Sequence, residues 1–218
     1  LVDDTLRFFG VGFNPSERRH KGHFVWQGVT IPTINNGALW GVKVRLGEQS
    51  RKWIKAKGDD PPKYISIKGG VAKSWLNLDS VGNAEAVLLV EGEFDAMLGH
   101  QLVGDLLPVV SYGGDPPPIL PPQLLRVKRI LCSFDHDEAG EGKAASWLTA
   151  HPRRVEVCPV PNPTGEPKFD LTDYHTKSGG NLRQWMGGLL SPPQPVTVSA
   201  AERRAARLIE LARRLAAA

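Results

Sequence analysis

Three hydrophobic segments in the middle of the chain, VLLV, RILCSF and RVEVCPV, are each followed by a pair of acidic residues. The pairs are Glu91 with Asp95, Asp135 with Asp137 and, after a longer loop, Asp170 with Asp173. In an open α/β sheet, functional groups gather at the carboxyl ends of the strands. We therefore expect carboxylates from separate strand ends to converge on one site.

Such a convergence predicts a bound divalent cation. Two carboxylates about 4 Å apart repel each other by about 4 kcal/mol at an effective dielectric constant near 20, and a cation removes that repulsion. Ligand sets made only of oxygen select Mg²⁺ or Mn²⁺ over zinc, and Mg²⁺ usually binds through few carboxylates together with substrate phosphates. We expect two such ions and phosphoryl or nucleotidyl transfer as the chemistry. The alternative is a set of solvated loop carboxylates.

The segments around these residues predict the layer that positions them. AEAVLLVEG, PVVSYGG, RILCSFD and RVEVCPV are typical of strands in a sheet that is buried on both faces. Helical spacing follows the first strand in EFDAMLGHQLVG, and a second helix is expected over about residues 140–149. Strands that alternate with helices indicate an α/β domain with a mainly parallel sheet.

Three other motifs fit the central acidic segment DHDEAGEGK less well. The fifth and twelfth positions of an EF-hand loop would be Ala139 and Ser146, which are not ligands. A Walker A loop would need Gly at Asp137 and Ser or Thr at Ala144. The segment also resembles the Asp-x-Asp motif of haloacid-dehalogenase-type phosphatases. These carry Thr or Val in place of Ala139 and leave Glu91 unexplained, so this interpretation stays a weaker alternative.

The net charge of +4 is a sum of three unlike regions. Residues 1–80 carry a net +6, residues 81–180 a net −6 and residues 181–218 a net +4. We take these ranges as a basic N-terminal subdomain, an α/β metal-binding domain and a C-terminal helical tail. The tail helix is expected from Ser199 to Leu215, where Ser199 and Glu202 form a capping box.

The N-terminal region predicts a twisted, mostly antiparallel sheet with one basic face. In LWGVKVRL, Trp40 is expected in the core with Val44, and the cations on the other face. A basic sheet beside aromatic rings suits single-stranded nucleic acid, because cations follow the phosphates and rings stack on bases. The expected contacts to template, primer or triphosphate are Lys43, Arg45, Lys63, Lys68 and, as an exposed stacking residue, Trp53. A solvated basic face is the alternative.

The acidic segments resemble a TOPRIM domain, the metal-binding fold of primases, topoisomerases and related nucleases. VEGEFDA carries its Glu-Gly at Glu91, and SFDHDEAG carries its Asp-x-Asp-x-x-Gly at Asp135 and Asp137. The resemblance implies that Glu91 acts in acid–base catalysis and that the two aspartates bind metal, so these three are the expected catalytic residues. The metal set would comprise all six acidic residues, because Asp95, Asp170 and Asp173 would assist them.

Further segments resemble DnaG-type primases of bacteria, phages and plasmids over roughly residues 22–180. GALWGVKVR matches the primase pattern Gly-x-x-x-Gly-x-x-x-Arg through Gly37, Gly41 and Arg45, and PPKYISIKGG is similar to the primase Pro-Lys-Tyr segment. FDLTDYHTKSG is similar to a later acidic motif, but Thr172 stands where many primases have Asp or Asn. The substitution is expected to weaken the third acidic position or to shift it to Asp173.

The resemblance implies a cytoplasmic primase core that joins NTPs or dNTPs on a single-stranded DNA template. A replicative helicase or a zinc-binding module would lie outside this chain. The alternatives are a TOPRIM nuclease or phosphotransferase, or a nucleic-acid-binding module without catalysis. A topoisomerase would need a nucleophilic tyrosine, whereas Tyr64, Tyr112 and Tyr174 are better explained as structural or substrate-contacting residues.

Four other residues have structural interpretations. Cys132 and Cys158 lie in apolar strand-like segments, so we expect them buried and reduced, with no zinc bound by this chain. His136 is expected to have a structural or solvent-facing role, and Lys143 to be a solvated lysine on the second helix. No apolar run approaches the 18 or so residues of a membrane span, so no membrane partner is expected.

Overall fold

The structure is a computed structural model that describes residues 1–20, 23–71, 74–113 and 119–191. It divides into two compact units, residues 1–183 and 184–218. The first unit holds every strand of the described chain. The last described helix is α6, Leu182–Leu190, and the tail helix expected after Ser199 lies outside the described residues.

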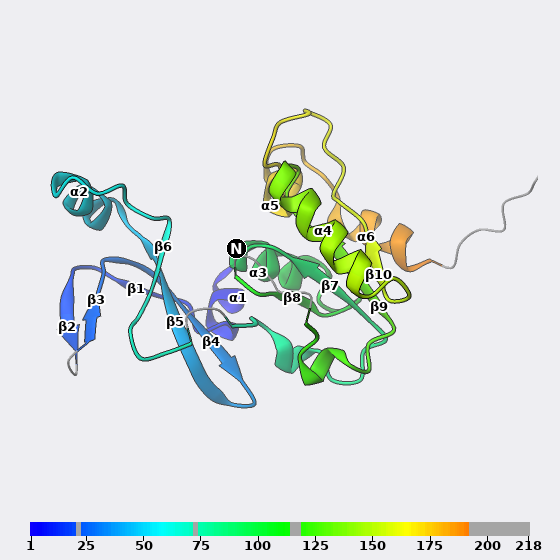
Figure 1. Ribbon diagram of the computed structural model, residues 1–218, viewed down its shortest axis with the longest axis horizontal. Helices are drawn as coiled ribbons and strands as arrows, with labels where there is room; N and C mark the ends of the chain where they lie inside the picture. Colours follow the sequence, from blue (N-terminus) through cyan, green and yellow to red (C-terminus); the bar gives the residue numbers. More distant parts are fainter. Residues whose placement is uncertain (21–22, 72–73, 114–118, 192–218) are drawn as a thin grey trace, which may run out of the picture. The chain divides into compact units, whose positions relative to one another are not determined.

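A four-stranded parallel sheet forms the α/β part of the first unit, as the sequence predicts (Figure 1). Its strand order is β10-β9-β7-β8, and each neighbouring pair is parallel. The strands are β7 (Ala86–Val90), β8 (Val109–Ser111), β9 (Arg129–Ser133) and β10 (Val155–Val157). The flanking helices are α3 (Glu93–Val103) after β7 and α4 (Glu138–Ala150) after β9, with the short α5 (Leu171–Thr176) after the long loop.

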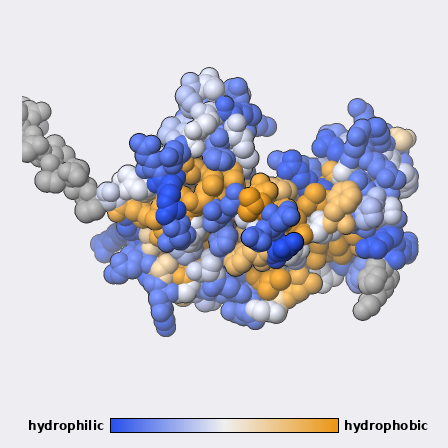
Figure 2. Space-filling model, turned by 180° about the vertical axis from the view of Figure 1, so that it is seen from behind, coloured by the Kyte–Doolittle hydropathy of each residue, from blue (hydrophilic) through white to orange (hydrophobic). Residues whose placement is uncertain are grey.

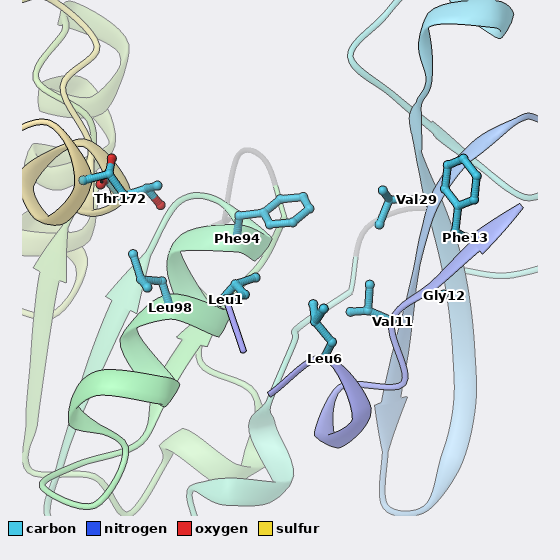
Figure 3. A pocket seen from close by; sticks show the side chains of 10 residues that line it. Leu1, Leu6, Val11, Gly12, Phe13, Val29, Phe94, Leu98 and Thr172 are labelled. Carbon is cyan, nitrogen blue, oxygen red and sulfur yellow. Dashed lines mark hydrogen bonds between the residues drawn. The ribbon is translucent and has the colours of Figure 1, made fainter. Parts of the chain in front are cut away.

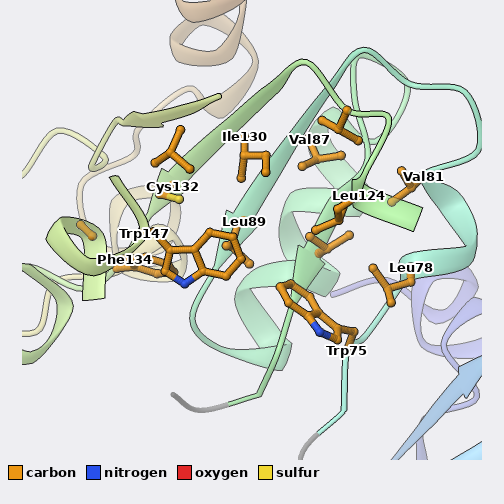
Figure 4. Close-up of a cluster of buried hydrophobic side chains, with 14 residues drawn as sticks. Trp75, Leu78, Val81, Val87, Leu89, Leu124, Ile130, Cys132, Phe134 and Trp147 are labelled. Carbon is orange, nitrogen blue, oxygen red and sulfur yellow. The ribbon is translucent and has the colours of Figure 1, made fainter. Parts of the chain in front are cut away.

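The core of this part lies against one face of the sheet (Figure 4). Leu89 of β7 and Ile130 of β9 pack with Trp147 of α4 and with Trp75, and all four side chains are buried. Gly140, Ala144 and Trp147 share the buried side of α4 at helical spacing, which seats that helix. The core therefore fixes the ends of β7 and β9, from which the acidic residues emerge.

Both cysteines are buried and free, as predicted. Burial raises the pKa of the Cys132 thiol far above its usual value and that of Cys158 to about 12. Both therefore remain thiols in the apolar interior.

The N-terminal region contains a four-stranded antiparallel sheet of order β1-β4-β5-β6. Its strands are β1 (Gly12–Asn14), β4 (Gly28–Asn35), β5 (Ala38–Leu46) and β6 (Tyr64–Ser66), and β2 (Arg18–His20) pairs separately with β3 (His23–Val25). The helices of this region are α1 (Asp3–Phe8) and α2 (Glu48–Ala56). The 3₁₀ turns η1 (Leu78–Ser80) and η2 (Pro122–Leu124) instead contribute Leu78 and Leu124 to the core beside the parallel sheet. The fold class is thus confirmed, although the helix over SRKWIKA is an addition to the expected sheet.

Trp40 departs from its predicted place in the core, because its side chain is 46% exposed. Thr33 pairs with Gly41 and Ile34 pairs with Leu39, so Trp40 is the extra residue of a bulge between β4 and β5. A bulge interrupts the alternation of side chains along a strand. Beyond it the predicted pattern returns, and Val44 is fully buried.

Across the described part of the chain, no helix is both long and apolar enough to cross a bilayer.

Candidate metal centre and adjacent cleft

Asp95, Asp135 and Asp170 each offer a carboxylate oxygen, and these oxygens lie within 4.8 Å of one another. Asp95 lies in the first turn of α3, Asp135 two residues beyond β9, and Asp170 at the N-cap of α5. The three segments are far apart in sequence and meet at the carboxyl ends of the parallel strands. The structure thus brings one residue of each predicted pair into a single cluster.

Two glycines allow the backbone to pass close to these carboxylates. A Cβ at Gly92 would lie 2.6 Å from Oδ2 of Asp95, and a Cβ at Gly140 would overlap the carbonyl oxygen of Asp135. The backbone clash means that position 140 requires glycine, and a side chain at position 92 would displace the carboxylate of Asp95. This explains physically the glycines of the VEG and DHDEAG segments.

The cluster is electrostatically unfavourable without a cation. Burial, with the nearby charge of Asp170, raises the pKa of Asp95 to about 6. Burial also raises the pKa of Asp135 to about 7, and the charges of Glu91, Asp95 and Asp170 add to the effect. Burial is also the main reason why the pKa of Asp170 is raised. Raised pKa values of this kind, from burial and from neighbouring negative charges, mark carboxylates that gather around a site.

The donor set fits a hard divalent cation. All three candidate ligands are oxygens, which suit Mg²⁺ or Mn²⁺ rather than zinc. Oε2 of Glu91 is buried and accepts no hydrogen bond, and the charge of Glu91 reaches Asp135. Asp95, Asp135 and Asp170 could therefore hold the metal that the sequence predicts, with Glu91 beside them.

The other predicted acidic residues have different partners. Glu91, directly after β7, forms an ion pair through Oε1 with Nζ of Lys143 at 2.6 Å. Asp137 caps α4 by accepting a hydrogen bond from the amide of Gly140 at 2.8 Å. Asp173 lies on α5 and forms an ion pair with Lys177 at 2.9 Å. None of the three belongs to the cluster of Asp95, Asp135 and Asp170.

Lys143 is not the solvated lysine that we expected. Its side chain is 15% exposed and is held by Glu91. The signal was present in the sequence, because Lys143 follows Gly140 by three residues and so lies on the edge of the helix side that faces the sheet.

Thr172 is a site residue whose role the sequence argument missed. Its amide and hydroxyl donate hydrogen bonds to Oδ1 of Asp95 at 3.0 and 2.5 Å. A short hydroxyl side chain is needed for this contact, and an acidic side chain there would repel Asp95. The third acidic position is therefore Asp170, and Asp173 does not replace it in the cluster.

The predicted basic contacts separate into two groups. Lys63 is exposed, and its charge lowers the pKa of both Asp95 and Asp170 against the effect of burial, so it lies beside the acidic cluster. Arg45 is exposed on β5, with its guanidinium 4.8 Å from the centre of the Phe94 ring. Both are placed to meet a polyanion that reaches the cluster.

Lys43 lies instead in a mostly buried contact between β5 and the start of α3. Its Nζ forms a 2.6 Å ion pair with Glu93 at the start of α3, and it also donates to the carbonyl of Gly113. The side chains of Lys43 and Glu93 are 14% and 7% exposed, so the ammonium group of Lys43 is paired inside the protein.

Lys68 and Trp53 lie elsewhere on the antiparallel region. Lys68 lines a small pocket with Trp40 and His23. Trp53 on α2 is 45% exposed, meets Trp26 edge to face, and has Nζ of Lys57 3.5 Å from its ring centre. The exposure of Trp53 agrees with the expectation for a stacking residue. His136 has a structural contact, because its Nε2 lies 2.6 Å from the carbonyl of Val160.

An apolar pocket of about 610 Å³ adjoins the acidic cluster. Phe94 and Leu98 of α3 lie opposite Phe13 and Val29 of the antiparallel sheet, and Thr172 lines the same space (Figure 3). Hydrophobic residues also gather in a band across the middle of the face shown in Figure 2, between more hydrophilic flanks. Through Thr172, the pocket and the acidic cluster share a wall.

No protein-family model and no curated protein matches this sequence. Solved structures do match its fold. The zinc-binding and RNA polymerase domains of the Aquifex aeolicus primase are 21% identical with a TM-score of 0.60, over 86% of this chain and 53% of that one. The primase fragment of the bacteriophage T7 primase-helicase is 19% identical with a TM-score of 0.57, over 86% and 70%.

A DnaG primase catalytic domain bound to single-stranded DNA is 15% identical with a TM-score of 0.55, over 86% of this chain and 68% of that one. The chain spans about half the length of the Aquifex protein that it matches. At these identities the likeness concerns the fold. It is the fold of DnaG-type primase catalytic cores, with a TOPRIM layer beside an antiparallel sheet, as the sequence predicts.

Proposed function

We propose that this chain is the catalytic core of a DnaG-type DNA primase, which joins nucleoside triphosphates on a single-stranded DNA template. The observation that carries the proposal is the cluster of Asp95, Asp135 and Asp170 within a primase fold. Exposed Lys63 beside that cluster supports it, because a cation there meets the phosphates of a nucleotide.

The roles of the residues follow from their contacts. Bound at the cluster, Mg²⁺ or Mn²⁺ would neutralise the triphosphate and align it for attack. Asp95, Asp135 and Asp170 would hold the metal, and Lys63 would bind phosphate oxygens. Oε2 of Glu91, which accepts no hydrogen bond, is the free site for the proton of the attacking 3′-hydroxyl.

The basic N-terminal region would receive the template. Arg45 beside Phe94, and Trp53 with Lys57, each pair a cation with an aromatic ring, the combination that holds phosphates and stacks bases. One structure of similar fold is a DnaG catalytic domain bound to single-stranded DNA. A zinc-binding module or a helicase outside this chain would be a further partner.

Incubation with single-stranded DNA, labelled NTPs or dNTPs and Mg²⁺ or Mn²⁺ tests the proposal. Oligonucleotide products are expected, and Asp135→Asn and Glu91→Gln should each abolish them while the proteins stay folded by circular dichroism. Self-priming templates with a preformed primer remove any dependence on a separate initiation module. Strand cleavage in place of synthesis would indicate a nuclease, and metal-independent DNA binding without product would indicate a non-catalytic module. Either outcome would overturn the proposal.

A further inference from the structure

The ion pair between Lys143 and Glu91 joins the middle of α4 to the end of β7. Nζ of Lys143 lies 2.6 Å from Oε1 of Glu91, and the side chains are 15% and 23% exposed. Because both groups are largely shielded from water, the attraction between them is less screened than in a surface ion pair, and losing one partner leaves the other charge uncompensated.

The contact leaves the two oxygens of Glu91 in different states. Oε1 accepts from the ammonium group, whereas Oε2 is buried without a hydrogen-bond partner. A carboxylate held by one oxygen cannot turn to present both to a metal. Glu91 is also close enough for its charge to act on Asp135, so its orientation matters to the acidic cluster.

The ammonium also changes the charge of the site. It brings one positive charge to the edge of a cluster whose three aspartates already repel one another. A cation in this position neutralises part of the negative charge of the site and so weakens its attraction for a divalent metal.

We propose that Lys143 is a positioning residue for the metal centre. It fixes Glu91 through Oε1, leaves Oε2 free for proton transfer, and by its charge keeps Glu91 from becoming an additional chelating ligand. Removing Lys143 should therefore tighten metal binding and slow nucleotide joining at the same time. This inference rests on the proposed function.

The expected change in metal binding can be tested without any reaction. The full chain is titrated with Mn²⁺ alone, and the free ion is measured by electron paramagnetic resonance. We expect Lys143→Met to bind Mn²⁺ roughly tenfold more tightly than the native protein, because a charge near the ion is removed. Primer extension should fall by about the same factor. Lys143→Arg, which keeps the charge and the hydrogen bond, should stay within about twofold in both measurements.

Two further variants make the comparison decisive. Lys128→Met removes a lysine from an exposed ion pair with Glu85, just before the strands of the same parallel sheet, and should change neither measurement. Lys143→Gln is a second neutral variant, so the result does not depend on the folding of one protein.

Unchanged or weaker Mn²⁺ binding in both neutral variants would overturn the role of Lys143, since loss of structure alone weakens binding. If the native chain binds Mn²⁺ and extends primers, that result leaves the proposed function intact. A native chain that binds no Mn²⁺ would contradict both proposals.

Discussion

Thr172 donates two hydrogen bonds to one oxygen of Asp95, from its hydroxyl at 2.5 Å and from its amide at 3.0 Å. Both bonds favour the ionised carboxylate and therefore oppose the burial that raises the pKa of Asp95. They also fix the carboxylate at the start of α3, facing α5. Thr172 thus favours the ionised form of Asp95 and fixes its orientation, both of which a metal ligand needs.

Replacing Thr172 by valine should weaken metal binding most at low pH. The variant keeps the side-chain shape but loses the hydroxyl, so the pKa of Asp95 should rise further above about 6. Asp95 would then hold its proton to a higher pH, and the acid limb of Mn²⁺ binding should move upward by about one pH unit. Titrations of Mn²⁺ between about pH 5.5 and 8 measure this shift. Thr172→Ser is the matched control, and equal curves for valine and serine would contradict the prediction.

The metal-free protein should be more stable near about pH 5 than near about pH 8 as far as this cluster contributes. Burial raises the pKa of Asp135 to about 7 and that of Asp95 to about 6. At pH values between the ordinary pKa of an aspartate and these raised pKa values, the folded state binds more protons than the unfolded state. The stability therefore falls as the pH rises through that window.

Thermal melts in chelator across that range test this pH dependence. Asp135→Asn should raise the melting temperature near about pH 8 by roughly 3 °C and flatten the dependence. Mg²⁺ should stabilise the native protein more at the higher pH. Asp59 is exposed, so Asp59→Asn serves as control. An equal effect of both substitutions would count against a role for the cluster.

Loss of Lys43 should destabilise the protein rather than only weaken nucleic-acid binding. Lys43→Met leaves Glu93, which is 6% exposed, as an unpaired buried charge. The expected cost is roughly 3 kcal/mol in the free energy of unfolding from urea denaturation. Lys52→Met, in an exposed pair with Glu48, should change it by less than about 0.5 kcal/mol. The double variant Lys43→Met, Glu93→Gln should recover part of the loss, and no recovery would mean that the ion pair is not the cause.

Trp53 should contribute to template binding without affecting metal binding. Its exposed ring beside Lys57 is a stacking surface, and Trp53→Ala should weaken binding of a labelled oligo(dT) by about 1–3 kcal/mol. Fluorescence anisotropy measures this change. Leu148→Ala removes another exposed apolar side chain, 41% exposed on α4, and should have no effect. If Trp53→Ala binds the oligonucleotide as tightly as the native protein, Trp53 has only a structural role and the prediction is wrong.

The parallel layer could be predicted from the sequence because its signals are local. A short continuous apolar run such as AVLLV is typical of a strand in a sheet covered on both faces, and β7 forms there. The rule that sites form at strand ends predicted that carboxylates would converge, but not that Asp95, Asp135 and Asp170 would be the three that do. These signals needed no knowledge of distant contacts.

The partners of the charged residues could not be predicted in the same way. Lys43 contacts Glu93 fifty residues away, and Lys143 contacts Glu91 fifty-two residues away, so each pairing depends on how two elements pack. Trp40 was misplaced because a bulge depends on the register between two strands, which the alternation within one strand does not reveal.

The bulge at Trp40 has a consequence for how this hairpin can vary among relatives. Lys43 and Arg45 share a face of β5 and reach different targets, a buried glutamate and the open cleft. An insertion or deletion of one residue between the bulge and Lys43 would turn both cations to the opposite face and bring Val44 out of the core. Indels of single residues should therefore be absent between the bulge and Lys43.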